Sequence, residues 1–386
     1  LLTRLIQENN SIKVALANVL SVDYLGGLAG SILFPIILLP TLGFILTSYL
    51  MGLLNLVVAL IIYLKYREQI AAKNLVLLVL LLAIVTVSLG TIKADKAEHY
   101  LEQRLYRDQV VYSKQSKYQK IVLTKDEQDL RLFLNGNIQF SSQDEYRYHE
   151  SLVHPVMSLV NQPKHILVLG GGDGLVIKQL LKYNNLEQID LVDLDQAVTN
   201  LAQQNKYLIK VNNNSLEDTK VKIYNQDAYQ FLKRSKQRYD VIISDLPDPN
   251  NESLNKLYTT TFYNLVYNHL KDNGGFVVQS TSSYFAPQSF WIIHHTINSS
   301  QFKEAIPYHC YVPSFGDWGF NLALKGNKFT KGNLDITVET EYLSEENIVS
   351  LFSFAKDILR WKHKVNRNTL FKPILIDHYY HEWKTY

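Results

Sequence analysis

A run of 41 residues without one charged or histidine side chain is the strongest constraint on the fold of this chain. It occupies residues 24–64, and a further apolar run occupies residues 75–92. One membrane-spanning helix needs about 20 residues, so the longer run can form two helices. A proline and a glycine near residues 40–43 predict the break between them. We therefore expect about three transmembrane helices within residues 1–93.

Buried helices of a soluble protein are the alternative interpretation. A helix that is apolar all round must be covered by protein or lipid, and little of the chain is left over to cover these. A signal peptide is disfavoured because the runs are too long and too many. We expect a multi-pass protein of the cell membrane, with its N-terminal helices in lipid and its remaining domains in the cytoplasm. Because the chain begins with Leu, the membrane region is expected to be truncated.

Basic residues flank the apolar runs at both ends, and an odd number of spans cannot place both ends on the positive side of the membrane. Charge alone therefore leaves the topology open.

The net charge of +3 is close to neutral and predicts no nucleic-acid partner. The single Cys310 excludes an intrachain disulfide and a cysteine-based metal site. His294 and His295 lack a third ligand at suitable spacing, so no metal is expected.

The rest of the chain separates into four regions. Residues 94–117 mix charges with Leu and Val at helical spacing, which predicts a linker helix. Residues 118–160 contain two short β-rich runs followed by Asn-Gly, which predicts a subdomain of β-hairpins. Residues 161–330 alternate strand and helix patterns. Residues 331–386 form a C-terminal extension whose aromatic side chains are expected to pack on the domain.

The alternation begins with an apolar strand at His165 and continues through several β–α units. Such a series predicts a Rossmann-like, doubly wound parallel sheet in an α/β domain. In these sheets ligands bind beyond the carboxyl ends of the strands. The expected strands after the first are residues 188–195, 221–228, 239–246 and 274–280.

The first strand leads into a turn of four glycines around one carboxylate, Gly170-Gly171-Gly172-Asp173-Gly174. Glycine lets the backbone turn tightly and approach a ligand closely. Nicotinamide, flavin and S-adenosylmethionine folds all use such turns, usually against an anionic ligand. A negative charge inside the turn indicates that this one faces a cation.

Acidic residues follow four successive strands. Asp193 comes about 20 residues after the glycine turn, where a carboxylate holds ribose hydroxyls. Asp227, with Ala228, is placed to meet an adenine edge, and Asp245 and Asp248 follow the fourth strand. Each one alone has an ordinary alternative as a helix cap or a solvated turn residue. Together they would surround a ligand with negative potential, which favours a cationic ligand.

Several ordered motifs give the chain a resemblance to the spermidine synthases (polyamine aminopropyltransferases), including the bacterial subgroup with a membrane-attached N-terminal region. The resemblance covers about residues 118–323. The motifs are "YHE" at 148–150, "GGGDG" at 170–174, "LVDLD" at 191–195, "DA" at 227–228, "DLPDP" at 245–249 and "VVQS" at 277–280.

This resemblance implies transfer of an aminopropyl group from decarboxylated S-adenosylmethionine, a co-substrate, to the diamine putrescine. The products would be spermidine and methylthioadenosine. No prosthetic group is implied, and the resemblance implies a homodimer formed through the hairpins. Donor-binding residues would be Gln119, Gly170, Gly172, Asp193, Asp227 and Ala228. Polyamine-binding residues would be His149, Asp173, Asp245, Asp248 and Gln279. Asp245 would be catalytic, together with Tyr148.

The chemistry of the substrates fits these residues. The donor carries a sulfonium and a primary ammonium but lacks the carboxylate of ordinary S-adenosylmethionine. Asp173 would attract that ammonium and repel a carboxylate in the same place. An alkyl amine has a pKa of about 10 and a free Asp one of about 4. Asp245 is therefore expected to orient the attacking amine and to take its proton as the new bond forms.

Three departures from the family pattern stand out. In the gate loop, residues 245–252, the family's Asp-Pro-x-Gly-Pro is replaced by Asp-Pro-Asn-Asn-Glu at 248–252, so its Gly and second Pro are missing. Phe315 stands near an expected Tyr, and Asp193 replaces a usual Glu. Two alternatives therefore stay open: an S-adenosylmethionine-dependent methyltransferase and a non-catalytic membrane protein that binds polyamines. The length of the diamine is not fixed by the sequence.

Overall fold

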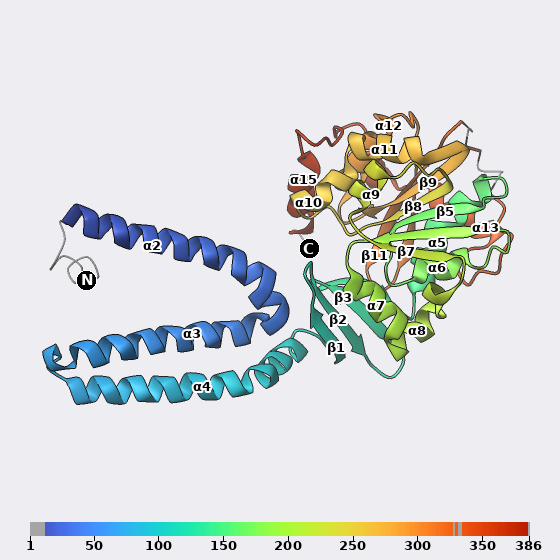
Figure 1. The fold of residues 1–386 in the computed structure, drawn as a ribbon. Coiled ribbons are helices and arrows are strands. Elements are labelled where there is room, and N and C mark those ends of the chain that lie inside the picture. The colour runs from blue at the N-terminus through green and yellow to red at the C-terminus, as the bar shows by residue number, and fades with distance from the viewer. Residues whose placement is uncertain (1–11, 327–328, 331–333, 385–386) are drawn as a thin grey trace. The chain divides into compact units, whose positions relative to one another are not determined.

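The computed structural model describes the chain except for residues 1–11, 327–328, 331–333 and 385–386. The chain divides into two compact units, each with its own secondary structure (Figure 1). The first unit comprises the residues up to Asp126 together with Leu134–Gly136. The second comprises Glu127–Phe133 together with Asn137–Tyr386.

Three long helices open the first unit: α2 (Ile12–Leu33), α3 (Leu39–Tyr66) and α4 (Lys73–Gln103). A π-helical turn joins α2 to α3, and Gly43 has a φ of +72°, so the helical path breaks where the sequence predicted. Two stretches, covering residues 16–69 and 73–103, are long and apolar enough to cross a membrane by length and composition. Most of their large apolar side chains are exposed.

The linker helix predicted for residues 94–117 is wrong in its second half. Helix α4 ends at Gln103, and strand β1 (Gln109–Gln115) pairs antiparallel with β2 (Lys120–Lys125). The run Val-Val-Tyr inside β1 favours a strand, and Val110 is buried opposite Thr124. The pairing of β1 with β2 therefore determines the structure of this segment, although the spacing of its charged and apolar residues predicted a helix.

Strands β3 (Leu130–Leu134) and β4 (Asn137–Ser141) flank a turn in which Asn135 and Gly136 both have positive φ, as the Asn-Gly pair predicted. Helix α5 (Glu145–Leu159) follows, although residues 118–160 were expected to form hairpins. Its apolar side chains recur at helical spacing and are buried. The predicted hairpin subdomain therefore needs correction, because its last third is a helix.

The second unit is built on a seven-stranded sheet in the order β10-β11-β9-β8-β5-β6-β7. Five strands are parallel: β5 (His165–Gly170), β6 (Gln188–Asp193), β7 (Val221–Asn225), β8 (Tyr239–Asp245) and β9 (Leu270–Ser282). Strand β11 (Gly316–Leu324) pairs antiparallel with β9, and the edge strand β10 (Ile306–Val312) pairs antiparallel with β11. The Rossmann-like α/β fold is confirmed, but the sheet is mixed rather than wholly parallel.

Helices connect the parallel strands and cover the sheet (Figure 1). They are α6 (Leu175–Leu180), α7 (Gln196–Gln204), α8 (Lys206–Asn212), α9 (Ala228–Arg234), α10 (Glu252–Asn255), α11 (Thr260–His269) and α12 (Pro287–Asn298). The C-terminal extension adds the short helices α13 (Glu345–Ile348) and α14 (Lys356–Leu359), and then α15 (Ile374–Trp383). Because both faces are covered, β5 is apolar from Ile166 to Leu169, and these four residues are fully buried.

The direction of chain progression reverses at β5. From β5 the chain continues through β6 and β7 on one side, and β8 and β9 lie on the other. The carboxyl ends of β5, β6 and β8 therefore meet at the switch point of the sheet, which is where open α/β sheets bind their ligands.

Candidate active site

The glycine turn after β5 makes the two central strand ends meet closely. Gly170 pairs with Asp245 in the parallel register of β5 and β8 and has a φ of +80°. A Cβ atom at Gly170 would lie 2.0 Å from the carbonyl oxygen of Asp245. Only glycine fits this position, and its presence brings the acid of β8 beside the turn.

Asp193, at the end of β6, accepts hydrogen bonds from backbone on both of its oxygens. The Gly172 N–H donates to Oδ2 at 3.0 Å, and the Asp195 N–H donates to Oδ1 at 2.8 Å. Burial raises the pKa of Asp193 to about 6, although these hydrogen bonds oppose the shift. A Cβ at Gly172 would lie 2.6 Å from Oδ2, so this glycine is also required by a close approach. Gly172 and Asp193, both predicted to bind decarboxylated S-adenosylmethionine, are thus hydrogen-bonded to each other.

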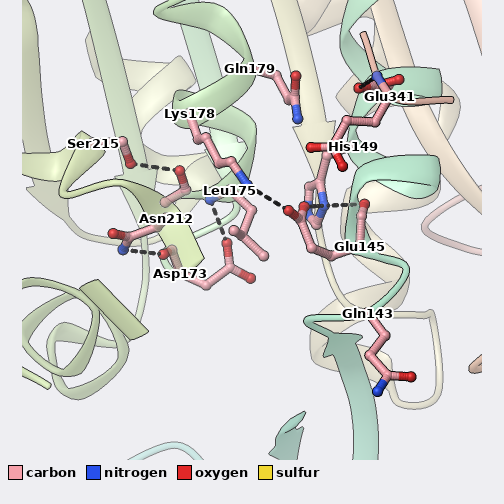
Figure 2. A network of polar contacts seen from close by, with 12 residues as sticks. Gln143, Glu145, His149, Asp173, Leu175, Lys178, Gln179, Asn212, Ser215 and Glu341 are labelled. Atoms are coloured by element: carbon pink, nitrogen blue, oxygen red, sulfur yellow. Dashed lines mark hydrogen bonds and ion pairs between the residues drawn. The ribbon is translucent and has the colours of Figure 1, made fainter. Parts of the chain in front are cut away.

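Asp173 is buried with only 8% of its surface exposed. Its Oδ1 accepts the N–H of Leu175 at 2.9 Å, and its backbone carbonyl accepts the side chain of Asn212 (Figure 2). Burial raises the pKa of Asp173 to about 6, partly opposed by the positive charge of His149. The carboxylate is held by the start of α6 while its second oxygen has no hydrogen-bond donor among the described residues.

Tyr148 on α5 contacts the acid at the end of β8. Its hydroxyl group donates to Oδ1 of Asp245 at 2.5 Å, and its side chain is only 7% exposed. Burial raises the pKa of Asp245, while the charge of His149 and the Tyr148 hydrogen bond act in the opposite direction. Burial and the neighbouring Asp245 raise the pKa of Tyr148 well above its ordinary value, so it stays a hydrogen-bond donor. The two predicted catalytic residues are therefore in direct contact.

His149 is a buried cation. Its Nδ1 lies 2.8 Å from Oε2 of Glu145, whose Oε1 lies 2.7 Å from Nζ of Lys178 (Figure 2). Burial lowers the pKa of His149, but the hydrogen bond and charge of Glu145 outweigh it and bring the pKa to about 9. At neutral pH this imidazole already holds its proton, so it cannot accept one from an amine.

Asp227 is the acid that departs from the expected pattern. Its Oδ1 accepts the N–H of Gln230 as the N-cap of α9, and its Oδ2 lies 2.6 Å from Nζ of Lys256. Because Lys256 pairs with this carboxylate, Asp227 contributes little to the negative potential at the strand ends. Ala228, next to it, is buried. In contrast, no Lys or Arg in the described parts of the chain forms an ion pair with the other four acids, Asp173, Asp193, Asp245 and Asp248.

Asp248 lies in the gate loop and is held by three side-chain donors. Gln279 Nε2 donates to Oδ1 at 3.1 Å, while Thr281 and Tyr379 donate to Oδ2 at 3.2 and 3.0 Å. Burial raises the pKa of Asp248 to about 6, and the three hydrogen bonds oppose the shift. Gln279 was predicted here, but Tyr379 was missed, because the aromatic side chains of the tail were expected only to pack.

Aromatic side chains line the space beside Tyr148. The Phe315 ring centroid lies 5.8 Å from that of Tyr148 and 5.0 Å from that of Trp318. The indole N–H of Trp318 donates to Oε1 of Gln279 at 3.2 Å. Trp318 therefore contributes to the hydrogen-bond network around Gln279. Phe315, which is near the position of the expected Tyr in the sequence, supplies a ring without a hydroxyl group beside Tyr148.

Gln119 lies in the first unit, in the turn between β1 and β2, where its backbone exchanges hydrogen bonds with Ser116. Its role toward the donor stays a prediction.

His294 and His295 both contact protein groups. Nδ1 of His294 lies 3.0 Å from Oδ1 of Asn321, and His295 contacts the Lys362 carbonyl. Among the described residues no cluster of three potential metal ligands occurs.

The acids at the strand ends, the Tyr148–Asp245 pair and the glycine turn can be compared with known proteins. A family model described as spermine/spermidine synthase domain matches residues 145–335. A polyamine aminopropyltransferase of Oceanobacillus iheyensis is 43% identical over 99% of this chain and 75% of its own length. A polyamine aminopropyltransferase of Leptospira interrogans is 42% identical over 99% of this chain and 76% of its own length.

The chain belongs to the spermine/spermidine synthase family. Two solved structures agree with this membership. A spermidine synthase in complex with the transition-state analogue AdoDATO has a TM-score of 0.61 and 27% identity, covering 66% of this chain and 89% of that one. The spermidine synthase of Thermotoga maritima has a TM-score of 0.59 and 26% identity, covering 66% and 87%. The family resemblance predicted from the motifs is thus confirmed.

Proposed function

We propose that the protein is a polyamine aminopropyltransferase that moves the aminopropyl group of decarboxylated S-adenosylmethionine to putrescine. Spermidine and methylthioadenosine are the products. The observation that carries this proposal is the set of four carboxylates at the strand ends, Asp173, Asp193, Asp245 and Asp248, without a lysine or arginine partner in the described structure. Buried charges are costly unless they are paired, so these acids fit a site that receives cations from its substrates.

The donor fits one side of this set. Asp193, held by Gly172, is placed for the ribose hydroxyls, and the glycine turn lets the backbone approach the nucleoside. Asp173 lies at the same turn with one oxygen available, which suits the primary ammonium of the aminopropyl arm. An intact S-adenosylmethionine would bring its carboxylate to this buried acid, and the repulsion would oppose its binding.

The acceptor fits the side formed by Tyr148, Asp245 and Asp248. One amine of putrescine attacks as the free base, and its lone pair forms a bond to the methylene carbon next to sulfur. The carbon–sulfur bonding pair moves to sulfur, which becomes the neutral thioether of methylthioadenosine. Asp245 accepts a hydrogen bond from the attacking nitrogen and takes a proton from it as positive charge develops there. Burial raises the pKa of Asp245, which makes it a better proton acceptor than an exposed Asp.

Purified protein supplied with decarboxylated S-adenosylmethionine and putrescine tests the proposal. We expect spermidine and methylthioadenosine to appear in equal amounts, measured by liquid chromatography with mass detection. Methyl transfer from intact S-adenosylmethionine would instead support the methyltransferase alternative. Tight binding of putrescine without release of methylthioadenosine would support the non-catalytic alternative, and either result would contradict the proposal.

We also propose that α2, α3 and α4 lie in a cell membrane, with the catalytic unit in the cytoplasm. The support is their length of 22, 28 and 31 residues together with the exposure of their large apolar side chains, since a span needs about 20 residues. We expect the protein to stay in the membrane fraction after extraction with alkaline carbonate. Release into the supernatant in folded, active form would contradict this. Association into a homodimer stays a prediction.

A further inference from the structure

The last helix of the chain, α15, contacts the gate loop. The hydroxyl group of Tyr379 donates to Oδ2 of Asp248 at 3.0 Å, across 131 residues of sequence. The next residue, Tyr380, donates to the backbone carbonyl of Asn250 in the same loop. Two adjacent side chains of one helix therefore hold an acid of the site and the backbone just beyond it.

The helix is itself fixed to the Rossmann-like unit. Glu382 accepts the backbone N–H groups of Gln288 and Ser289 at 2.8 and 3.0 Å, and the Ser289 hydroxyl at 2.7 Å, in the first turn of α12. Asn368, fully buried before the helix, donates to Oδ1 of Asn255 and to the Tyr258 carbonyl. These hydrogen bonds fix the position of α15 and therefore the position of Tyr379 beside the loop.

The aromatic residues of α15 also extend toward the acceptor side. Trp383 lies 6.0 Å from Tyr379, 5.8 Å from Phe285 and 6.5 Å from Trp318, measured between ring centroids. Trp318 in turn donates to Gln279, which is the donor to Oδ1 of Asp248. Oδ2 of Asp248 is thus bound directly by Tyr379 of α15, and Oδ1 is bound by Gln279, whose partner Trp318 packs against Trp383 of α15.

The loop needs support from outside. Pro247 and Pro249 restrict the backbone on either side of Asp248, but Asn250 and Asn251 beyond them are not restricted in this way. Within the loop, the Asn250 N–H donates to the Asp248 carbonyl and Asn251 donates to the side chain of Asn250. These local hydrogen bonds do not direct the Asp248 side chain, whereas Tyr379 does.

We propose that α15 contributes to the acceptor site. Tyr379 is a positioning residue that orients the Asp248 carboxylate toward the ammonium group of the acceptor. The proposal rests on the proposed aminopropyltransferase function. It assigns to the C-terminal extension a role in binding the acceptor.

The pKa of Asp248 offers a readout that separates positioning from simple stability. Burial raises this pKa to about 6, and the Tyr379 hydrogen bond is one of the contacts that lower it. Removing the hydroxyl group raises the pKa further, so a larger fraction of Asp248 is protonated and neutral on the acid side of neutrality. Well above that pKa the carboxylate is charged in both proteins, and the difference in acceptor binding becomes smaller.

The test is the Tyr379→Phe variant, compared with the unmodified protein at about pH 6.5 and about pH 8.5. We expect the KM for putrescine to rise about tenfold at the lower pH, because a hydrogen bond to a charged group is lost. The ratio of KM values should be smaller at the higher pH, while the KM for decarboxylated S-adenosylmethionine stays nearly unchanged. Tyr380→Phe is the matched control, because its hydroxyl group donates to a backbone carbonyl that does not titrate, and any effect should be the same at both pH values.

An unchanged KM for putrescine in Tyr379→Phe would overturn the proposal. So would a rise that is equal at both pH values and shared by the donor, because that pattern indicates general loosening of the fold. Calorimetric titration of putrescine with methylthioadenosine present gives the same comparison without turnover. The proposal therefore remains testable if the unmodified protein makes no spermidine, a result that would contradict the proposed function alone.

Discussion

Replacing Asp245 by Asn is expected to lower kcat by about a thousandfold, because a positioned proton acceptor contributes about 10²- to 10⁴-fold to a rate. Asn keeps the shape and can still accept the Tyr148 hydroxyl hydrogen bond, which is 2.5 Å long in the native protein. It cannot take the proton from the attacking nitrogen, and it removes one negative charge from the acceptor side. Steady-state kinetics with both substrates saturating measures the loss.

Asp240→Asn is the matched control for this variant. Asp240 lies at the opposite end of β8, where it accepts the N–H groups of Lys164 and His165 and pairs with Lys271. Substitution there changes the same chemical group on the same strand, away from the carboxyl ends, so kcat should be nearly unchanged. Methylthioadenosine should bind both variants as it binds the native protein. A kcat for Asp245→Asn within about tenfold of native would remove Asp245 from the proposed proton transfer.

Replacing Asp173 by Asn is expected to lower kcat/KM for decarboxylated S-adenosylmethionine by about a hundredfold, since the loss of one partner of a buried charge pair costs about 2–5 kcal/mol. The Asn side chain keeps an oxygen for the Leu175 N–H, so the start of α6 retains its hydrogen bond. What is lost is the negative charge facing the ammonium of the aminopropyl arm. Kinetics at varied donor concentration and saturating putrescine gives the value.

Methylthioadenosine supplies an internal control for Asp173→Asn, because it lacks the aminopropyl arm. Its dissociation constant should change little, while that of the donor rises. Equal weakening of the two ligands would mean that Asp173 acts by shaping the glycine turn, and the proposed contact with the ammonium would be rejected.

The sequence was sufficient to predict the parallel core and the meeting of several strand ends at one edge of the sheet. Apolar runs ending in Gly170, Asp193 and Asp245 are local signals, and the rule that parallel strands end at one edge brings these residues together. The family motifs added Tyr148, whose helix was not expected because the strand-rich region before it suggested more hairpins.

Long-range pairings could not be predicted in the same way. Lys256 neutralises Asp227 from 29 residues away, and nothing in the local pattern of either residue records that ion pair. Tyr379 reaches Asp248 across a much larger separation, and an aromatic tail has the same local pattern whether it packs or donates. Strand β11 runs antiparallel to β9, with β10 paired beyond it, and this arrangement depends on how the chain returns after α12.

The charges near the strand ends are divided between one paired acid and four carboxylates without a lysine or arginine partner among the described residues. His149 and Lys178 both pair with Glu145, so these two cations are turned toward one acid. Burial makes the charged form of the four remaining carboxylates costly and raises their pKa values, and the positive charge of His149 opposes this shift at Asp173 and Asp245. Ligand cations are expected to offset that cost when they bind.

Titration calorimetry of the native protein with the two forms of the donor tests this electrostatic account most directly. Decarboxylated S-adenosylmethionine is predicted to bind at least about a hundredfold more tightly than intact S-adenosylmethionine, a difference of about 2.7 kcal/mol. Equal affinity for the two, or tighter binding of the carboxylated form, would contradict the claim that the acids at the strand ends select an amine and exclude an amino-acid head group.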